Sequence, residues 1–239
     1  NQMELIDIHA HILPGVDDGS RGMEESETML SMAYCQGIRR IIATPHYSRR
    51  RGSGGLAELA DRLNARAQAI YGDFEILPGH ETYYYEGLAE ALKSGQALTL
   101  AGSRYVLVEF DPGVSYRQLY QGVRKLIMAR YVPVLAHVER YLCLRDEGNF
   151  RELVQCDCRM QMNYDSLAGP FWDPGVRWCR KKVEGGCIHL LATDMHRVDY
   201  RKPDLEKPMA WLQKHVGERR LRAMVWDNPL AIMKNERMG

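Results

Sequence analysis

The 239-residue sequence contains no apolar run close to the roughly 18 residues that a membrane-spanning helix requires. It also shows no signal peptide, since a strand-like segment begins almost at once with Glu4 and Leu5. Lys and Arg total 32 against 31 Asp and Glu, so the net charge is +1 and the basic surplus of a nucleic-acid-binding protein is missing. We therefore expect a cytoplasmic protein with no membrane insertion and no nucleic-acid partner.

The sequence lacks the cysteine pattern of a disulfide-stapled or thiol-dependent protein. Its six cysteines form no C-x-x-C pair, and a chain of 27.5 kDa is large enough to fold around a core without disulfides. A cysteine phosphatase needs an arginine six positions after its nucleophile. The residues at those positions are Ile41, Asn149, Met162, Tyr164, Gly185 and Thr193. Reduced thiols without a catalytic role are the prediction.

Two other catalytic templates are also missing. There is no G-x-x-x-x-G-K-[ST] phosphate loop and no G-x-S-x-G nucleophile elbow. The glycines of 52–55 weakly resemble a dinucleotide-binding loop, but they follow three arginines instead of the end of a strand. We interpret segment 48–55 as a mobile, basic loop.

What the sequence does contain is a regular alternation of short β-rich runs and helical patterns, with an ordinary 45% of hydrophobic and 26% of charged residues. The expected strands are Leu5–Ala10, Arg40–Thr44, Phe74–Pro78, Tyr105–Phe110, Val132–His137, Arg159–Asn163 and Ile188–Thr193. The expected helices are Glu24–Gln36, Leu56–Tyr71, Tyr116–Arg130, Asn149–Gln155, Pro174–Glu184 and Leu205–His215. This alternation predicts one α/β domain over residues 3–239, with a parallel sheet that is either open or closed into a barrel.

Metal-ligating residue types occur at the carboxyl ends of six of these strands, where parallel α/β folds place their active sites. The candidates are His9, His11, His46, Glu81, Glu109, His137, Asp194, His196 and one residue of the Asp17–Asp18 pair. A single histidine at a strand end is more often a packed residue than a ligand. Imidazoles and carboxylates converging from six strand ends are instead typical of a site for Zn, Mn or Fe. Nine ligands suffice for two or three ions.

Several arginines and tyrosines accompany these residues. Arg140 follows His137 by three positions and Arg201 follows His196 by five, so both could bind a phosphate as two-pronged donors, although a surface ion pair is the simpler role for either alone. Arg49–Arg51 read as a solvated loop that also attracts an acidic ligand. Tyr83–Tyr85 either line the pocket or pack structurally.

The order of the motifs adds a family resemblance. It is carried by Asp7-Ile8-His9-Ala10-His11-Ile12-Leu13-Pro14-Gly15-Val16-Asp17-Asp18-Gly19, Ala43-Thr44-Pro45-His46-Tyr47, Gly79-His80-Glu81, Ala136-His137-Val138-Glu139-Arg140-Tyr141, Gln161-Met162-Asn163 and Thr193-Asp194-Met195-His196. Over nearly the whole chain this resembles the polymerase-and-histidinol-phosphatase (PHP) family and, within it, the bacterial capsule-type protein-tyrosine phosphatases of the CpsB/YwqE/CapC group.

The resemblance implies a distorted seven-stranded, TIM-like (β/α)7 barrel with three metal ions. It assigns His9, His11, Asp18, His46, Glu81, Glu109, His137, Asp194 and His196 as metal ligands, with Glu81 bridging, and it alone selects Asp18 over Asp17. Arg140 and Arg201 match the catalytic, phosphate-contacting arginines. Val138 and Met195 replace a usual proline and alanine. Because neither is a ligand, we expect the chemistry to be retained and any effect to fall on the shape of the pocket and on the preference for substrate.

The function implied is metal-dependent hydrolysis of phosphotyrosine on an autophosphorylated bacterial tyrosine kinase that regulates capsule or exopolysaccharide synthesis. Manganese is the first candidate metal, with iron, zinc and magnesium as alternatives. The competing interpretations are a PHP phosphatase for a small metabolite of the histidinol-phosphate type, a phosphodiesterase, and a metal-stabilised module that binds the kinase without turnover. The sequence leaves the oligomeric state open.

Overall fold

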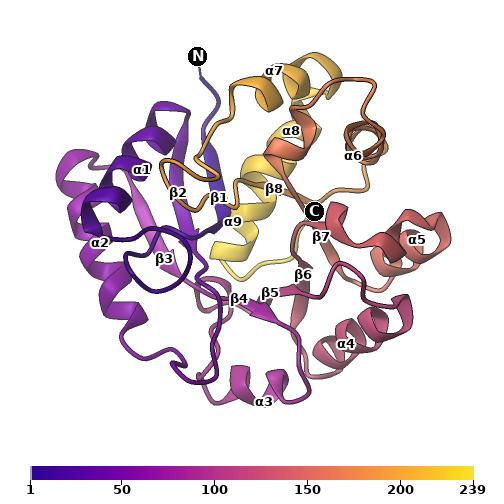
Figure 1. The fold of residues 1–239 in the computed structure, drawn as a ribbon, viewed down its shortest axis with the longest axis horizontal. Coiled ribbons are helices and arrows are strands. Elements are labelled where there is room, and N and C mark those ends of the chain that lie inside the picture. Colours follow the sequence, from indigo (N-terminus) through magenta and orange to yellow (C-terminus); the bar gives the residue numbers. More distant parts are fainter. Residues whose placement is uncertain (1) are drawn as a thin grey trace.

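The computed structural model describes residues 2–239, whose strands pair only in parallel. One sheet has the order β1-β2-β3 and the other β4-β5-β6-β7-β8, and together they surround a common centre (Figure 1). The strands are β1 (Leu5–Ala10), β2 (Ile38–Ala43), β3 (Glu75–Pro78), β4 (Glu81–Tyr83), β5 (Tyr105–Glu109), β6 (Val132–Leu135), β7 (Arg159–Asn163) and β8 (Leu190–Ala192). The predicted α/β class with parallel strands is confirmed.

The distorted seven-stranded barrel that the resemblance implies is not confirmed in residues 2–239. They make sheets of three and five strands that meet only through single bridges, Ala10 with Met195 and His46 with Glu81. The structure has an additional strand because the extended segment is interrupted at Gly79 and His80, between β3 and β4. A Cβ on Gly79 would lie 3.2 Å from the Ile42 side chain, and the backbone N–H of Leu98 donates to His80 Nδ1 over 2.9 Å.

Helices surround the strands (Figure 1). They are α1 (Met23–Cys35), α2 (Leu56–Ile70), α3 (Leu88–Lys93), α4 (Tyr116–Met128), α5 (Glu147–Gln155), α6 (Pro174–Glu184), α7 (Glu206–His215), α8 (Glu218–Arg222) and α9 (Asn228–Met233). All six predicted helices and all seven predicted strands are present, with ends within two residues of the prediction. The short elements α3, α8, α9 and β4 were not predicted.

Side-chain capping fixes where three of the helices, α4, α5 and α6, begin. The side chains of Ser115, Asp146 and Asp173 accept hydrogen bonds from backbone N–H groups in the first turns of α4, α5 and α6. Such caps satisfy donors that have no partner within the helix. In α6 the proline that follows the cap has no N–H to satisfy and has its φ already set for a helix.

The C-terminal helix α9 closes one end of the strands. An inner apolar cluster joins Ile6, Ile8 and Leu107 of the strands to Ala231 and Ile232 of α9. The same end is sealed by hydrogen bonds from the Tyr105 hydroxyl to the Glu236 carbonyl and from Asn228 Nδ2 to the His189 carbonyl. These bonds lie at the amino ends of β5 and β8, so only the carboxyl ends of the strands remain for a functional site.

The basic loop 48–55, which the sequence predicts to be mobile, makes hydrogen bonds to its surroundings. Ser53 Oγ donates to the Gly95 carbonyl over 2.7 Å, and Gln96 Nε2 donates to the Arg49 carbonyl over 3.2 Å. Arg51 donates to the Val16 carbonyl over 2.9 Å, which places the loop beside the Asp17–Asp18 turn. Between residues 2 and 239, no helix combines the length and the apolar character needed to cross a bilayer.

Candidate metal centre

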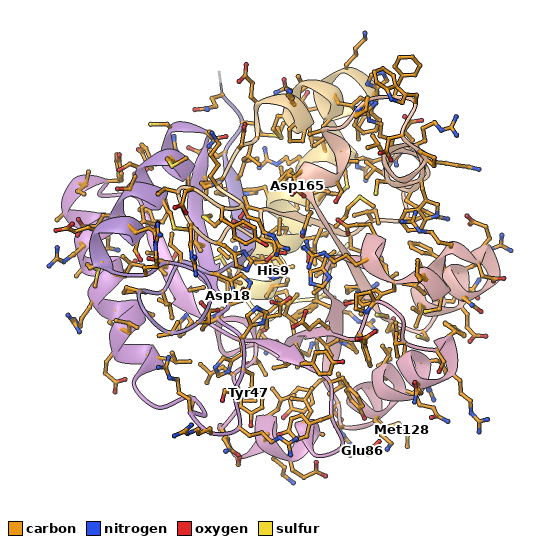
Figure 2. The ribbon with its side chains drawn as sticks, in the orientation of Figure 1. His9, Asp18, Tyr47, Glu86, Met128 and Asp165 are labelled. Atoms are coloured by element: carbon orange, nitrogen blue, oxygen red, sulfur yellow. The ribbon has the colours of Figure 1, made fainter. Side chains whose placement is uncertain are left out.

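The nine candidate ligands converge at the carboxyl ends of the strands. Figure 2 shows His9 near the middle of the ring of strands, with Asp18 close by. Three groups of residues have ligand atoms within 4.8 Å of one another and share members: His11, Asp18, His46 and His196; His9, His11, Glu81 and Asp194; and His46, Glu81 and Glu109. His137 joins the last group because its Nε2 lies 3.1 Å from Glu81 Oε2 and 3.4 Å from Glu109 Oε2.

The buried part of this cluster contains polar atoms that lack a hydrogen bond. His9 Nε2, His11 Nε2 and Asp194 Oδ1 are inaccessible to water and have no hydrogen-bond partner. The two imidazole nitrogens lie only 3.2 Å and 3.1 Å from this Asp194 oxygen. Since buried polar atoms are almost always paired, three orphaned atoms directed at one point fit a cation between them.

The electrostatics of the cluster agree with that fit. Burial alone would raise the pKa of Glu81, yet the imidazoles of His9, His11 and His137 hold that pKa well below its ordinary value. Burial would lower the pKa of His137, but its hydrogen bonds to Glu109 and Glu81 raise it to about 9. Glu81 therefore stays ionised, as a ligand of a hard or borderline cation must be, and a cation that binds His137 would displace a proton from its imidazole.

The structure distinguishes the two neighbouring aspartates of the first motif. Asp17 accepts hydrogen bonds from His11 Nδ1 over 2.8 Å and from the backbone N–H of His46 over 3.0 Å, so its oxygens hold other site residues in place. Asp18 Oδ1 instead lies 3.4 Å from His46 Nε2 and 3.7 Å from His196 Nε2. This geometry agrees with the choice of Asp18 that the family resemblance made.

The glycine after these aspartates is required by close packing. A Cβ on Gly19 would lie 2.2 Å from the His11 carbonyl oxygen, which is far inside contact distance. That carbonyl also accepts a hydrogen bond from the Ser20 N–H over 3.0 Å. The motif therefore folds its turn directly onto the backbone of His11.

Two of the candidate ligands sit in strained backbone at the ends of strands. His137 has a φ of 34° and Asp194 a φ of 53°, both in the left-handed region that side chains other than glycine seldom adopt. Pairing between β1 and β2 is also irregular from Asp7 to Ala10, the stretch that holds His9. Irregularities of this kind re-aim side chains and concentrate at functional sites.

The cluster is open on one side. The side chains of His46 and Asp18 are 38% and 59% exposed, whereas those of Glu81 and Asp194 are only 2% and 3% exposed. A ligand can therefore approach from the His46 and Asp18 side, while Glu81 and Asp194 lie beneath the surface.

Both predicted arginines reach this site. Arg140 Nη2 donates to Asp194 Oδ2 over 3.3 Å, and Arg201 Nη1 lies 3.9 Å from the same oxygen. Arg201 is held by a turn in which its carbonyl accepts from the N–H of His196 over 3.0 Å. With about a third of each side chain exposed, both guanidiniums are accessible to an anion beside the cluster.

The site also contains residues to which sequence reasoning gave no role. Gln161 Oε1 lies 3.0 Å from His9 Nδ1, and Asn163 Nδ2 donates to Asp194 Oδ2 over 3.1 Å. Both are buried polar residues at alternate positions of β7, the one predicted strand without a predicted ligand. A buried strand carrying amides on one face was the available signal.

Two of the tyrosines of residues 83–85 contact other aromatic or basic side chains. Tyr84 stacks on Phe110, and Tyr85 lies under Arg49. Tyr83 and Tyr84 also line part of a cavity of about 570 Å³, and none of the nine candidate ligands lines this cavity.

All six cysteines are free thiols. Burial raises the pKa of the Cys158 and Cys179 thiols, which excludes these two as thiolate nucleophiles.

Comparisons with known proteins agree with this geometry. The family model for capsular polysaccharide synthesis, CpsB/CapC, matches residues 5–234. The tyrosine-protein phosphatase CpsB of Streptococcus pneumoniae is 34% identical over 97% of this chain and 99% of its own. For the tyrosine-protein phosphatase YwqE of Bacillus subtilis, the identity is 33% over 97% of this chain and 92% of its own.

Solved structures give the same result. A structure from work on YwqE of Bacillus subtilis and CpsB of Streptococcus pneumoniae, described as unique metal-dependent tyrosine phosphatases, superimposes with a TM-score of 0.88. It is 32% identical and covers 98% of this chain and 96% of its own. A histidinol phosphate phosphatase of Lactococcus lactis, with a TM-score of 0.57, 14% identity and coverage of 90% and 94%, shares the fold.

Proposed function

Since the chain belongs to the CpsB/CapC family of capsular polysaccharide synthesis, we propose that it is a metal-dependent protein-tyrosine phosphatase. Its substrate is an autophosphorylated bacterial tyrosine kinase that controls capsule or exopolysaccharide synthesis, and it acts in the cytoplasm. The observation that carries the proposal is the set of orphaned buried atoms of His9, His11 and Asp194 beside two accessible guanidiniums.

We assign the metal ligands to His9, His11, Asp18, His46, Glu81, Glu109, His137, Asp194 and His196. The three overlapping groups of these residues support three ions, with Glu81 as a bridging carboxylate because it is shared by two groups. Their mixture of imidazoles and carboxylates suits a divalent transition-metal ion, and our first candidate is manganese, with iron, zinc and magnesium as alternatives. When bound, such ions supply Lewis-acid stabilisation of phosphoryl oxygens and make water reactive at neutral pH.

The arginines act on the phosphoryl group. Asp194 holds Arg140 and Arg201 beside the cluster, so their N–H donors are already in place when a phosphate arrives. Planar guanidiniums bind phosphoryl oxygens with two parallel hydrogen bonds. These bonds strengthen as charge builds on the oxygens in the transition state, and this selective stabilisation accelerates hydrolysis.

The shape of the site favours a phosphorylated side chain at a protein surface. The exposed edge at His46 and Asp18 gives a projecting phosphotyrosine direct access to the cluster. A tyrosine leaving group also needs little protonation, because phenol has a pKa of about 10. An aliphatic alkoxide, as in histidinol phosphate, would require more assistance from an acid.

Two features of architecture belong to the same proposal. We treat residues 3–239 as one PHP-type domain. The interrupted pair β3 and β4 then counts as a single third strand, and the two single bridges between the sheets are the seams of a distorted seven-stranded barrel.

Initial rates on three substrates test the function. We expect a phosphotyrosine peptide to be hydrolysed faster than histidinol phosphate or a phosphodiester, and a chelator to abolish the rate until metal is returned. Faster hydrolysis of histidinol phosphate or of the diester would identify a metabolite phosphatase or a phosphodiesterase instead. Binding of a phosphotyrosine protein without hydrolysis, with metal bound, would identify a binding module.

A further inference from the structure

A chain of hydrogen bonds connects two members of the buried metal group through amide side chains of β7. It runs from His9 to Gln161, from Gln161 to Asn163, and from Asn163 to Asp194. His9 and Asp194 belong to the same group of candidate ligands. All four side chains are almost completely buried, so water cannot replace any of these bonds.

The orientation of the first amide is fixed by a backbone donor. The N–H of His137 lies 2.9 Å from Gln161 Oε1, and since an N–H can only donate, the atom facing it must be the amide oxygen. The same oxygen lies 3.0 Å from His9 Nδ1. His9 must then carry its proton on Nδ1, which leaves the lone pair of Nε2 directed at Glu81 and Asp194.

The remaining bonds follow in one direction. Gln161 Nε2 donates to Asn163 Oδ1 over 3.0 Å, so the amide nitrogen of Asn163 faces Asp194 and donates to Oδ2 over 3.1 Å. That bond, with the one from Arg140, occupies Oδ2 and leaves Oδ1 of Asp194 as the orphaned buried oxygen. Every donor in the chain is matched to one acceptor.

We propose that Gln161 and Asn163 are positioning residues that set the protonated nitrogen of His9 and the free oxygen of Asp194, so that both present lone pairs to the same ion. The proposal rests on the ligand assignment of the proposed function. It accounts for two buried amides on β7, a strand that supplies no candidate ligand. Residues that hold a ligand in this way typically change metal affinity by about 10- to 100-fold when removed.

The affinity for Zn²⁺, measured in the full-length protein against a competing chelator, tests this chain of hydrogen bonds. We expect Gln161→Leu and Asn163→Leu each to weaken affinity by about 10- to 100-fold. Gln161→Glu should recover only part of the affinity, since a carboxylate still accepts from His9 and from the His137 N–H but cannot donate to Asn163 Oδ1. The control is Asn228→Leu, which removes a buried amide that donates to the His189 carbonyl at the opposite end of the strands and should lower Tm alone.

A second measurement does not depend on metal or on activity. In the metal-free protein at alkaline pH, nitrogen NMR should show His9 protonated on Nδ1, and Gln161→Leu should shift the proton towards Nε2. Wild-type Zn²⁺ affinity in both leucine variants, or a His9 already protonated on Nε2 in the wild-type protein, would overturn the proposal. If Gln161→Leu does not fold, Asn163→Leu and the wild-type tautomer still decide. A protein that binds Zn²⁺ as described but leaves phosphotyrosine intact would refute the proposed function and not this chain.

Discussion

Asp17 Oδ2 accepts a hydrogen bond of 2.8 Å from His11 Nδ1, and this bond turns the other ring nitrogen of His11 towards Glu81 and Asp194. The same Asp17 oxygen accepts from the backbone N–H of His46 over 3.0 Å. One carboxylate that lies outside the candidate ligand groups therefore orients one candidate ligand and fixes the backbone of a second.

The hydrogen bond between Asp17 and His11 leads to a prediction about substitutions of Asp17. Asp17→Ala should lower metal affinity by about 10- to 100-fold, because His11 loses the acceptor that orients it. Asp17→Asn should lose less, since an amide oxygen can still accept from Nδ1. Chelator competition on both variants measures the effect, and equal loss in the two would show that orientation of His11 is not what Asp17 provides.

Removing a candidate metal ligand should have a larger effect than removing Asp17. We expect His11→Ala, Glu81→Ala and His196→Ala each to abolish turnover of a phosphotyrosine peptide, because each belongs to one of the overlapping groups of candidate metal ligands. The matched control is His215→Ala, an exposed histidine that stacks on Trp211 in α7, which should keep wild-type turnover. Near-normal turnover at saturating Mn²⁺ in any of the three would remove that residue from the ligand set.

A buried histidine outside the site gives a prediction about stability. Burial lowers the pKa of His189 to about 4, and its Nδ1 accepts a hydrogen bond from the Met160 N–H over 2.9 Å. The unfolded chain, in which the pKa of His189 is near its ordinary value of about 6.5, takes up this proton first as the pH falls. The contribution of His189 to the free energy of unfolding is therefore complete above pH 6.5 and is lost as the pH falls towards 4.

The measurement is urea unfolding of the metal-free protein at pH 7.5 and pH 5. The wild-type protein should lose about 1–2 kcal/mol more between these pH values than His189→Gln, in which nothing titrates at this position. Comparison with the variant is needed because the histidines of the site also titrate. Equal losses in the two proteins would show that His189 is not held neutral by the fold.

The sequence predicted the strands and the residues at their ends well because both depend on local pattern. An apolar pattern predicts a strand, and the predicted end of that strand gives the position of His46 or Glu109. Neither step needs knowledge of the rest of the chain. What escaped prediction depends on contacts distant in sequence. The break at Gly79 and His80 forms against Ile42 and Leu98, and the roles of Gln161 and Asn163 exist only once β7 lies beside β6 and β8.

The backbone of the site escaped prediction for another reason. His137 and Asp194 have positive φ, a conformation that residue type alone argues against and that only the packed surroundings can maintain. Residue pattern likewise could not separate Asp17 from Asp18, since adjacent carboxylates look equivalent until the turn at Gly19 directs them to different partners.

Arg201 provides the sharpest separation of substrate binding from metal binding. Its guanidinium reaches the Asp194 carboxylate from a turn beyond His196, so a phosphoryl oxygen at the cluster would meet its N–H donors. A charged hydrogen bond that strengthens in the transition state contributes about 2–4 kcal/mol. We therefore expect Arg201→Ala to lower kcat/KM on a phosphotyrosine peptide by about two orders of magnitude while metal content and Tm stay near wild type. Arg201→Lys should recover only part of the rate, because an ammonium cannot form the planar two-pronged contact. Steady-state kinetics beside elemental analysis decide the matter, since an unchanged kcat/KM, or metal lost together with activity, would show that Arg201 does not act on the substrate.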